Sequence, residues 1–403
     1  MNGSGQAQPP GHRRRATLMV TLVLAGLTML GPFTIDTIFP AFTRIGTEFA
    51  VSATALQQVT SSYLLTFAVM SLFHGPLSDA IGRKPVMIGG LIGYILASIG
   101  CALSPNLGVL LVMRMLQGAF VGAATIVSRV VIRDLYSGPQ AHRMMSRIMM
   151  IFAVAPAVAP VVGGWLLQAG DWPIIFWAVA GYAGVAIVAV VWLLPETVPP
   201  ERAPFRARAI LRSILTVARD PGMIRLALVT AFVMGGQFVY IMGAPIIVVD
   251  LLGLGEQDFW VLFVPVIGGM MVGSWLSGRL ADRINRSRLI DLALVGSVLM
   301  AIVNVVVAMI APALPWAMVG PALLTAGIAI AFPAIQLEIL DAFPSHRGAA
   351  ASFGMFGSLA FNAVIAGVIA PAVATTLAAV AATALTFAGV GSILWLWHRR
   401  VNG

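Results

Sequence analysis

Twelve long apolar segments run through the chain and constrain its fold more than any other feature. A membrane-spanning helix needs about 20 mostly apolar residues. Segments of that kind fall at residues 16–40, 55–75, 86–104, 107–129, 145–169, 174–194, 223–247, 259–278, 288–311, 316–338, 348–371 and 373–397. They are about twice as long as a membrane β-strand and do not alternate. The sequence therefore predicts an all-α membrane protein with twelve transmembrane helices.

The low content of charged residues indicates that most of the protein surface is surrounded by lipid. Only 10% of the residues are charged and 59% are hydrophobic, whereas soluble proteins carry about 25% charged residues. The net charge of +9 could indicate binding of nucleic acid. However, the cytoplasmic loops of membrane proteins collect Lys and Arg, which explains the excess, so we expect no nucleic-acid partner. The single cysteine, Cys101, excludes an internal disulfide and supports no metal cluster. We expect neither a metal nor a cofactor.

The positions of the basic residues indicate an orientation. If the N-terminus is cytoplasmic, all but two of the 24 Lys and Arg residues fall in cytoplasmic segments. The exceptions are Arg44, in an outer loop, and Arg114, inside a helix. Because cytoplasmic loops collect basic residues, we expect a multi-pass protein of the bacterial inner membrane with both termini in the cytoplasm.

One long polar connection divides the chain into two halves. Within it, residues 205–218 could form an amphipathic helix on the anionic inner leaflet, or a solvated linker. The predicted units are a cytoplasmic tail at 1–15, a six-helix bundle at 16–195, a cytoplasmic linker at 196–222, a second six-helix bundle at 223–397 and a tail at 398–403.

The two halves share a loop motif. Residues 75–83 read GPLSDAIGR and residues 278–286 read GRLADRINR, so both fit G-x-L-x-D-x-x-x-R after the second span of their half. Repeated halves are typical of transporters, whose substrate site lies at the interface between the repeats. The motif therefore predicts two pseudo-symmetric bundles.

Three motifs resemble those of the major facilitator superfamily. Residues 75–84 resemble its signature loop, residues 114–118 (RMLQG) its intramembrane Arg motif, and residues 155–164 (APAVAPVVGG) the motif typical of proton-coupled drug exporters. The further segments that look like the bicyclomycin and chloramphenicol resistance subfamily lie at residues 35–40, 131–136 and 238–245.

The resemblance implies proton-coupled efflux of drugs or small lipophilic compounds by alternating access. Its partners are then a small-molecule substrate, protons and membrane lipid, and we expect a monomer without enzymatic activity. The chain contains no phosphate-binding G-x-x-x-x-G-K-[ST] loop, which points to gradients as the energy source. Two alternatives stay open: a symporter or uniporter for a small metabolite, and a receptor or membrane enzyme.

Two ionisable residues inside predicted spans are the candidates for proton coupling. Asp36 is the one carboxylate well inside a span, and such acids usually mark a proton or substrate path. The alternative is a helix-end residue near the outer interface. Arg114 needs a partner at this depth, for which Gln117 and backbone carbonyls of the first helix are candidates. The resemblance ties Arg114 to proton exchange, and a structural clamp is the alternative.

The loop motif suggests a latch that closes the cytoplasmic side. An aspartate is favourable at a helix N-terminus, and the resemblance implies that Asp79 lies near the start of the eleventh span, at about Ala349. Arg133 is a second candidate partner. The alternative is that the basic loop only determines topology. The predicted latch residues are Gly75, Asp79, Arg83, Lys84, Arg133 and Asp282.

The antiporter-type motif acts through shape. Pro156 and Pro160 should bend the fifth span, and Gly163 and Gly164 allow close approach of a neighbour. The expected neighbour is the eighth span, and ordinary membrane packing is the alternative. The glycines that we expect to face the motif are Gly268, Gly269 and Gly273.

Polar and aromatic residues at middle depth form the candidate substrate pocket. With so few fixed charges, the pocket suits a neutral or weakly charged lipophilic compound, and methionines offer adaptable surface. Any of these residues could instead form interhelical hydrogen bonds. The candidates are Tyr63, Gln117, Met234, Gln237, Phe238, Tyr240, Asn304, Gln336, Phe361 and Asn362.

Overall fold

The computed structural model describes residues 10–136, 138–197, 207–281, 283–343 and 347–402, and no strand occurs in these ranges. Within these ranges, eleven helical segments are long and apolar enough to cross a membrane. One more long helix, α6, has the shorter apolar stretch Val154–Ala169 among the residues considered. The all-α membrane fold predicted from the sequence is confirmed.

The helices follow the predicted order. The N-terminal half contains α1 (Pro10–Asp36), η1 (Phe39–Ala41), α2 (Phe42–Phe49), α3 (Ala53–Ile81), α4 (Arg83–Ala102), α5 (Leu107–Leu135), α6 (Gly138–Ala169) and α7 (Pro173–Leu193). After α8 (Ala207–Ala218), the C-terminal half contains α9 (Pro221–Met242), η2 (Ile246–Leu251), α10 (Trp260–Ala281), α11 (Arg286–Ile310), α12 (Trp316–Ala342), α13 (Arg347–Val364), η3 (Ile365–Ile369), α14 (Ala370–Val373) and α15 (Leu377–Asn402).

Short polar side chains start several of the spans. Ser52 caps α3 through the Ala55 amide, and Asn106 caps α5 through the Val109 amide at 3.0 Å. Asp220 does the same for α9. Each side chain satisfies an amide that has no partner within its own helix, a contribution of about 1 kcal/mol.

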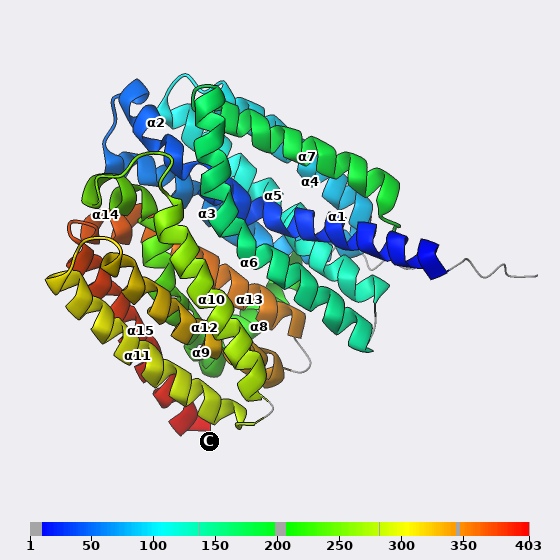
Figure 1. Ribbon diagram of the computed structural model, residues 1–403. Helices are drawn as coiled ribbons and strands as arrows, with labels where there is room; N and C mark the ends of the chain where they lie inside the picture. Colours follow the sequence, from blue (N-terminus) through cyan, green and yellow to red (C-terminus); the bar gives the residue numbers. More distant parts are fainter. Residues whose placement is uncertain (1–9, 137, 198–206, 282, 344–346, 403) are drawn as a thin grey trace, which may run out of the picture.

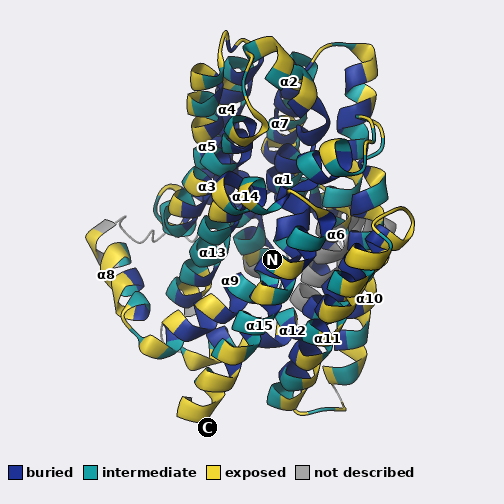
Figure 2. Cartoon of the chain, turned by 90° about the vertical axis from the view of Figure 1, so that its left-hand side faces the viewer, coloured by how far each residue is buried: buried dark blue, intermediate teal, exposed yellow. Residues whose placement is uncertain are grey.

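The helices pack into two bundles that diverge from one end (Figure 1). Most contacts lie within a half, and the halves meet mainly where α3 packs on α13 and η3 and where α6 packs on α10. We call the end that carries α2 and α14 the α2 end, and the opposite end, where α3 joins α4, the α8 end. Buried residues occupy the middle of each half, and exposed residues lie mainly on its outside (Figure 2).

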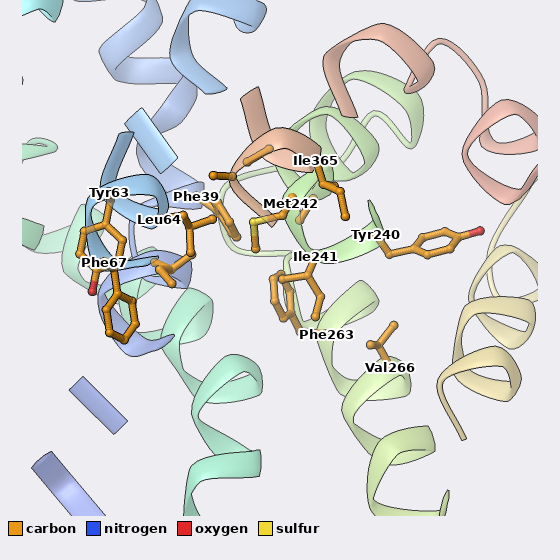
Figure 3. Packing of buried hydrophobic residues seen from close by; sticks show 14 of the residues in the cluster. Phe39, Tyr63, Leu64, Phe67, Tyr240, Ile241, Met242, Phe263, Val266 and Ile365 are labelled. Atoms are coloured by element: carbon orange, nitrogen blue, oxygen red, sulfur yellow. The ribbon is translucent and has the colours of Figure 1, made fainter. Parts of the chain in front are cut away.

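Apolar side chains from both halves meet near the α2 end. Phe39 and Leu64 face Met242, Phe263 and Ile365 across the interface (Figure 3). All five are buried, and the ring centroids of Phe39 and Phe263 lie 6.3 Å apart. This contact excludes water between the halves at the α2 end.

Candidate functional site

Asp36 is the last residue of α1 and is buried in the protein, with 3% of its surface exposed. Its side chain makes no hydrogen bond or ion pair within the described part of the chain. The side chain therefore faces neither bulk water nor lipid. An acid buried in this way in a membrane helix is costly, which favours a functional role.

Arg114 of α5 is completely buried and is held by α3 and by its own helix. Its Nε donates to the Val59 carbonyl at 3.1 Å, and its Nη1 donates to Oε1 of Gln117 at 2.8 Å. The guanidinium also lies over the ring of Tyr63, 4.5 Å from the centroid. Among the described residues no carboxylate pairs with Arg114, so cation–π and dipole contacts stabilise the charge.

The partners of Arg114 were predicted only in part. The Gln117 contact is confirmed. The prediction that Arg114 binds a backbone carbonyl of the first helix is wrong, because Arg114 donates to the Val59 carbonyl of α3. The hydroxyl of Tyr63 instead donates to the Gly31 carbonyl of α1, at 3.2 Å. Tyr63 therefore connects the guanidinium to the helix that ends in Asp36.

Ser98 and Tyr94 of α4 connect Gln117 to α1. Gln117 donates through Nε2 to the Ser98 hydroxyl at 2.7 Å, and Ser98 donates to the Tyr94 carbonyl at 2.7 Å. The Tyr94 hydroxyl lies 2.5 Å from the hydroxyl of Thr34, two residues before Asp36. The sequence analysis missed Ser98, Tyr94 and Thr34, because their polarity has no distinctive spacing.

Two further buried polar residues were missed on α3. Gln57 and Thr60 are completely buried, three residues apart on one helix face. The amide of Gln57 and the hydroxyl of Thr60 have no hydrogen-bond partner within the described residues. A buried polar group without a partner costs about 1–3 kcal/mol. Because they lie next to Val59, the partner of Arg114, we add both residues to the candidate site.

Replacing Arg114 with Lys should lower transport at least about tenfold. Lysine keeps the charge but cannot donate to the Val59 carbonyl and Gln117 in the same fork geometry, and one lost charged hydrogen bond costs about 1.5–3 kcal/mol. The measurement is the initial transport rate at matched protein levels. Arg288→Lys at the exposed start of α11 is the control. Unchanged transport by Arg114→Lys would show that the fork of donors does not matter.

The antiporter-type motif lies against α1 and against the other half. Pro156 and Pro160 lie inside α6. A Cβ added to Gly163 would lie 2.2 Å from the Thr37 carbonyl oxygen, directly after Asp36, so only glycine fits there. A Cβ added to Gly164 would lie 2.9 Å from the Glu256 carbonyl oxygen in the C-terminal half. The motif thus connects the Asp36 region to the interface between the halves.

The expected pairing of glycines between the fifth and eighth spans is wrong. Helices α6 and α10 do contact each other. However, Cβ atoms added to Gly269 and Gly273 would meet the carbonyl oxygens of Ala322 and Ala326 on α12, at 2.0 and 2.1 Å. A Cβ added to Gly268 meets no atom within 4 Å. Glycine rows on different helices therefore serve different neighbours.

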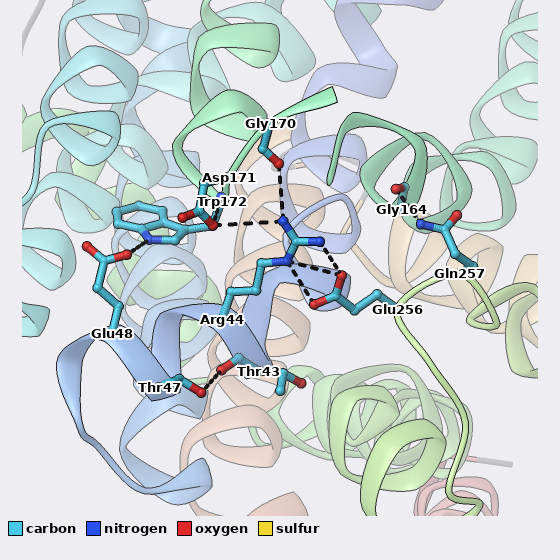
Figure 4. Close-up of polar contacts among 10 residues, drawn as sticks. All are labelled: Thr43, Arg44, Thr47, Glu48, Gly164, Gly170, Asp171, Trp172, Glu256 and Gln257. Atoms are coloured by element: carbon cyan, nitrogen blue, oxygen red, sulfur yellow. Dashed lines mark hydrogen bonds and ion pairs between the residues drawn. The ribbon is translucent and has the colours of Figure 1, made fainter. Parts of the chain in front are cut away.

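An ion pair joins the halves at the α2 end (Figure 4). Arg44 of α2 donates to Glu256, in the loop before α10, with Nε–Oε1 at 3.0 Å and Nη2–Oε2 at 2.8 Å. Arg44 also donates to the Gly170 carbonyl at 3.2 Å, and Asp171 lies 3.9 Å away. We call the Arg44–Glu256 pair the α2-end latch. Its bidentate geometry makes it stronger than a simple surface pair.

Other hydrogen bonds between the halves lie at the same end. Gln58 and Ser61 of α3 donate to the carbonyls of Gly367 and Ala363, at 2.7 and 2.8 Å. Gln257, beside Glu256, donates to the Gly164 carbonyl at 2.6 Å. The structure therefore shows a state that is closed at the α2 end.

Removing the charge of Glu256 should loosen the α2 end. In Glu256→Gln, the charged Arg44 contacts a neutral amide, which binds it more weakly than the carboxylate. Loss of a partly exposed ion pair costs about 1 kcal/mol, which shifts the open–closed equilibrium about fivefold. Spin labels at Thr47→Cys and Gly255→Cys would report it as a larger population of long distances. Asp250→Asn, an exposed acid on the same connection, should leave the distances unchanged. An unchanged distribution in Glu256→Gln would exclude a role in closure.

The signature loop forms a network within the N-terminal half. Arg83 pairs with Asp79 at 2.5 Å and with Asp134 at 3.0 Å. The backbone amides of Arg83 and Lys84 donate to the carboxylate of Glu196 at 2.9 and 3.0 Å, at the positive end of the α4 dipole. Gly82, with φ of 123°, makes the turn that presents these amides.

The predicted contact of Asp79 with the start of α13 is not present among the described residues. Asp79 contacts Arg83 rather than the start of α13, and 53% of its side chain is exposed. Gly75 lies inside α3, where an added Cβ meets no atom within 4 Å. The side chain of Arg133 and the whole of Asp282 lie outside the described residues. The sequence analysis missed Glu196, since a helix-capping role needs no recognisable motif.

Several pocket candidates have internal partners. Asn304 donates to the Tyr240 hydroxyl at 2.6 Å, and Tyr240 points away from the interface (Figure 3). Phe361 packs with Phe232 and Phe387, at centroid distances of 4.9 and 5.4 Å. These contacts lie inside the C-terminal half. They agree with the alternative that these residues stabilise the fold through contacts between helices. A role in substrate binding stays a prediction.

The remaining pocket candidates have fewer specific contacts. The amide of Gln237 lies 4.0 Å from the sulfur of Met270, and Asn362 is 5% exposed. Tyr63 and Gln117 belong to the Arg114 network described above. The half-buried candidates are Met234, Phe238 and Gln336.

Several curated bacterial proteins are similar to this chain over two thirds or more of its length. The uncharacterized MFS-type transporter YdgK of Bacillus subtilis is 32% identical over 307 residues, which cover 75% of each chain. The bicyclomycin resistance protein homolog of Haemophilus influenzae is 29% identical over 70% of this chain and 71% of its own. Multidrug resistance protein D of Escherichia coli is 30% identical over 66% and 67%, respectively.

The fold comparison and the family model agree. The crystal structure of a bacterial homolog of the human lysosomal transporter Spinster, in an inward-facing and unoccupied conformation, matches with a TM-score of 0.73. The match covers 98% of both chains at 16% identity, which shows a shared fold. The model of the Major Facilitator Superfamily matches residues 21–365. The chain therefore belongs to the major facilitator superfamily of membrane transporters.

Proposed function

We propose that the chain exports drugs or other small lipophilic compounds in exchange for protons. The observation that carries this proposal is the burial of Asp36 and Arg114 in an apolar two-bundle transporter, connected through Tyr63 and α1. The names of the bicyclomycin and multidrug resistance relatives support the substrate class. The antiporter-type motif at residues 155–164, whose Gly163 packs on the residue after Asp36, supports exchange rather than symport.

The positions of the basic residues support a bacterial inner-membrane location with both termini in the cytoplasm. In this orientation the α2 end faces the periplasm and the α8 end faces the cytoplasm. We further propose that a monomer carries out transport, with 16–195 and 223–397 moving as two bundles around the linker at 196–222. The substrate site then lies between the bundles.

The proposed transport cycle starts from the state in which the α2 end is closed. In the present state the Arg44–Glu256 pair and the apolar contact seal the periplasmic end, while the described partner of Asp79 is Arg83 of its own half. In this scheme Asp36 releases its proton toward the cytoplasm and substrate enters from that side. Opening of the α2-end latch then exposes the substrate and Asp36 to the periplasm, where the substrate leaves and a proton binds.

The experiment is a growth-inhibition panel in a bacterial host that lacks its own major exporters. The proposal predicts that expression raises the inhibitory concentration of at least one lipophilic drug severalfold, and that an uncoupler of the proton gradient removes the effect. Cells that express the Asp36→Asn variant at the same membrane level are the matched control. No protection against any compound, or protection that persists with the uncoupler, would contradict the proposal.

A further inference from the structure

Helix α8, which lies between the two halves in the sequence, has one buried apolar face and one exposed apolar face. Ile214 and Val217 are buried, with 6% and 0% of their surfaces exposed, where α8 packs on α13 and α9. Leu211 and Leu215, one turn apart on another face, are 47% and 42% exposed. Figure 2 shows α8 projecting from the side of the bundles. Packing among the described residues therefore explains only one of the two faces.

Arginines flank the exposed leucines. Arg208, Arg212 and Arg219 are exposed, and none of the three forms an ion pair within the described residues. The helix itself contains no acidic residue. An open groove of about 370 Å³ lies along this face, lined by Arg208, Leu211, Arg212, Leu215, Thr216 and Arg219.

We propose that this face of α8 binds anionic phospholipid of the adjacent leaflet. Two leucines at helical spacing insert among acyl chains, and the three guanidinium groups bind the phosphates, which arginine recognises through paired donors. A soluble phosphate would satisfy the arginines but would leave Leu211 and Leu215 in water. The combination of charge and exposed apolar surface therefore favours a lipid over a free anion. The inference does not depend on which solute the protein carries.

The consequence is an anchor at the hinge between the halves. Because α8 also packs on α13 and leads into α9, lipid bound on its outer face fixes the linker at the membrane surface while the bundles move. The basic segment then has a physical role beyond orienting the chain.

The test places a nitroxide label at Leu215→Cys in the full-length protein; Cys101 is buried. The protein is reconstituted in vesicles of phosphatidylcholine, with or without phosphatidylglycerol. Label accessibility is compared between oxygen, which enriches in lipid, and a water-soluble nickel chelate. The expected result is a severalfold rise in the oxygen-to-nickel ratio when phosphatidylglycerol is present. Inorganic phosphate added to the neutral vesicles should cause no rise.

Charge-matched variants distinguish a site on α8 from a general effect of net charge. The variant Arg208→Gln/Arg212→Gln/Arg219→Gln should lose the response to phosphatidylglycerol. The variant Arg283→Gln/Arg288→Gln/Arg400→Gln removes as many charges from other exposed positions and should keep it. Equal loss in both variants, an equal response to phosphate, or a water-exposed label in both vesicle types would overturn the proposal.

Discussion

The Asp36→Asn variant should lose proton-driven export while it folds and inserts normally. Asparagine has nearly the same shape as aspartate but cannot release or bind a proton at neutral pH, so the exchange of proton and substrate cannot take place. We expect active export to fall at least about a hundredfold, to the background of empty vesicles, as for loss of an essential proton carrier. The measurement is substrate flux in proteoliposomes with an imposed pH gradient.

Three controls separate coupling from folding. The thermal unfolding temperature of Asp36→Asn should match or exceed that of the unmodified protein, because the variant removes an ionisable group from a buried site. Exchange of labelled for unlabelled substrate, which needs no net proton movement, should persist. Asp250→Asn, at an exposed position near the α2 end, should export normally. Full proton-driven export by Asp36→Asn would remove Asp36 from the mechanism.

Gly163→Ala should be the most damaging single-methyl change in the α6 motif. The added Cβ would lie 2.2 Å from the Thr37 carbonyl oxygen, which belongs to the backbone and cannot swing aside. Either α6 or the end of α1 must move, at a cost of about 1–3 kcal/mol for overpacking. We expect a transport rate lowered about tenfold or more and a lower unfolding temperature.

The same substitution on α10 provides the matched control. An added Cβ at Gly268 meets no atom within 4 Å, and the residue is exposed. Gly268→Ala should therefore leave transport unchanged and should stabilise the helix slightly, since alanine favours helix by about 1 kcal/mol over glycine. If both variants transport alike, close packing of α6 on α1 is not required.

The sequence predicted the helices and the family well because both depend on local signals. Each span is a continuous apolar segment, and the signature loop keeps its residues at fixed spacing. The burial of Asp36 and the contact of Arg114 with Gln117 were also predictable. A lone charge in an apolar helix has few alternatives, and Gln117 lies one turn from Arg114.

Contacts between distant segments could not be predicted in the same way. Arg44 and Glu256 are 212 positions apart, and nothing in either loop indicates the pairing. The one signal was that Arg44 lies in a segment predicted to be outside, unlike most of the other basic residues. The neighbour that Gly163 contacts depends on how α6 is rotated about its axis. A segment that is apolar on all sides does not specify that rotation.

The most direct test of the proposed exchange measures the direction of proton flow. Proteoliposomes are loaded with a pH-sensitive dye, and a transported drug from the growth panel is added without an imposed gradient. The account predicts that drug entry is accompanied by proton exit, so the lumen becomes alkaline, and that Asp36→Asn abolishes the change. Acidification of the lumen as the drug enters would show symport and would contradict the account.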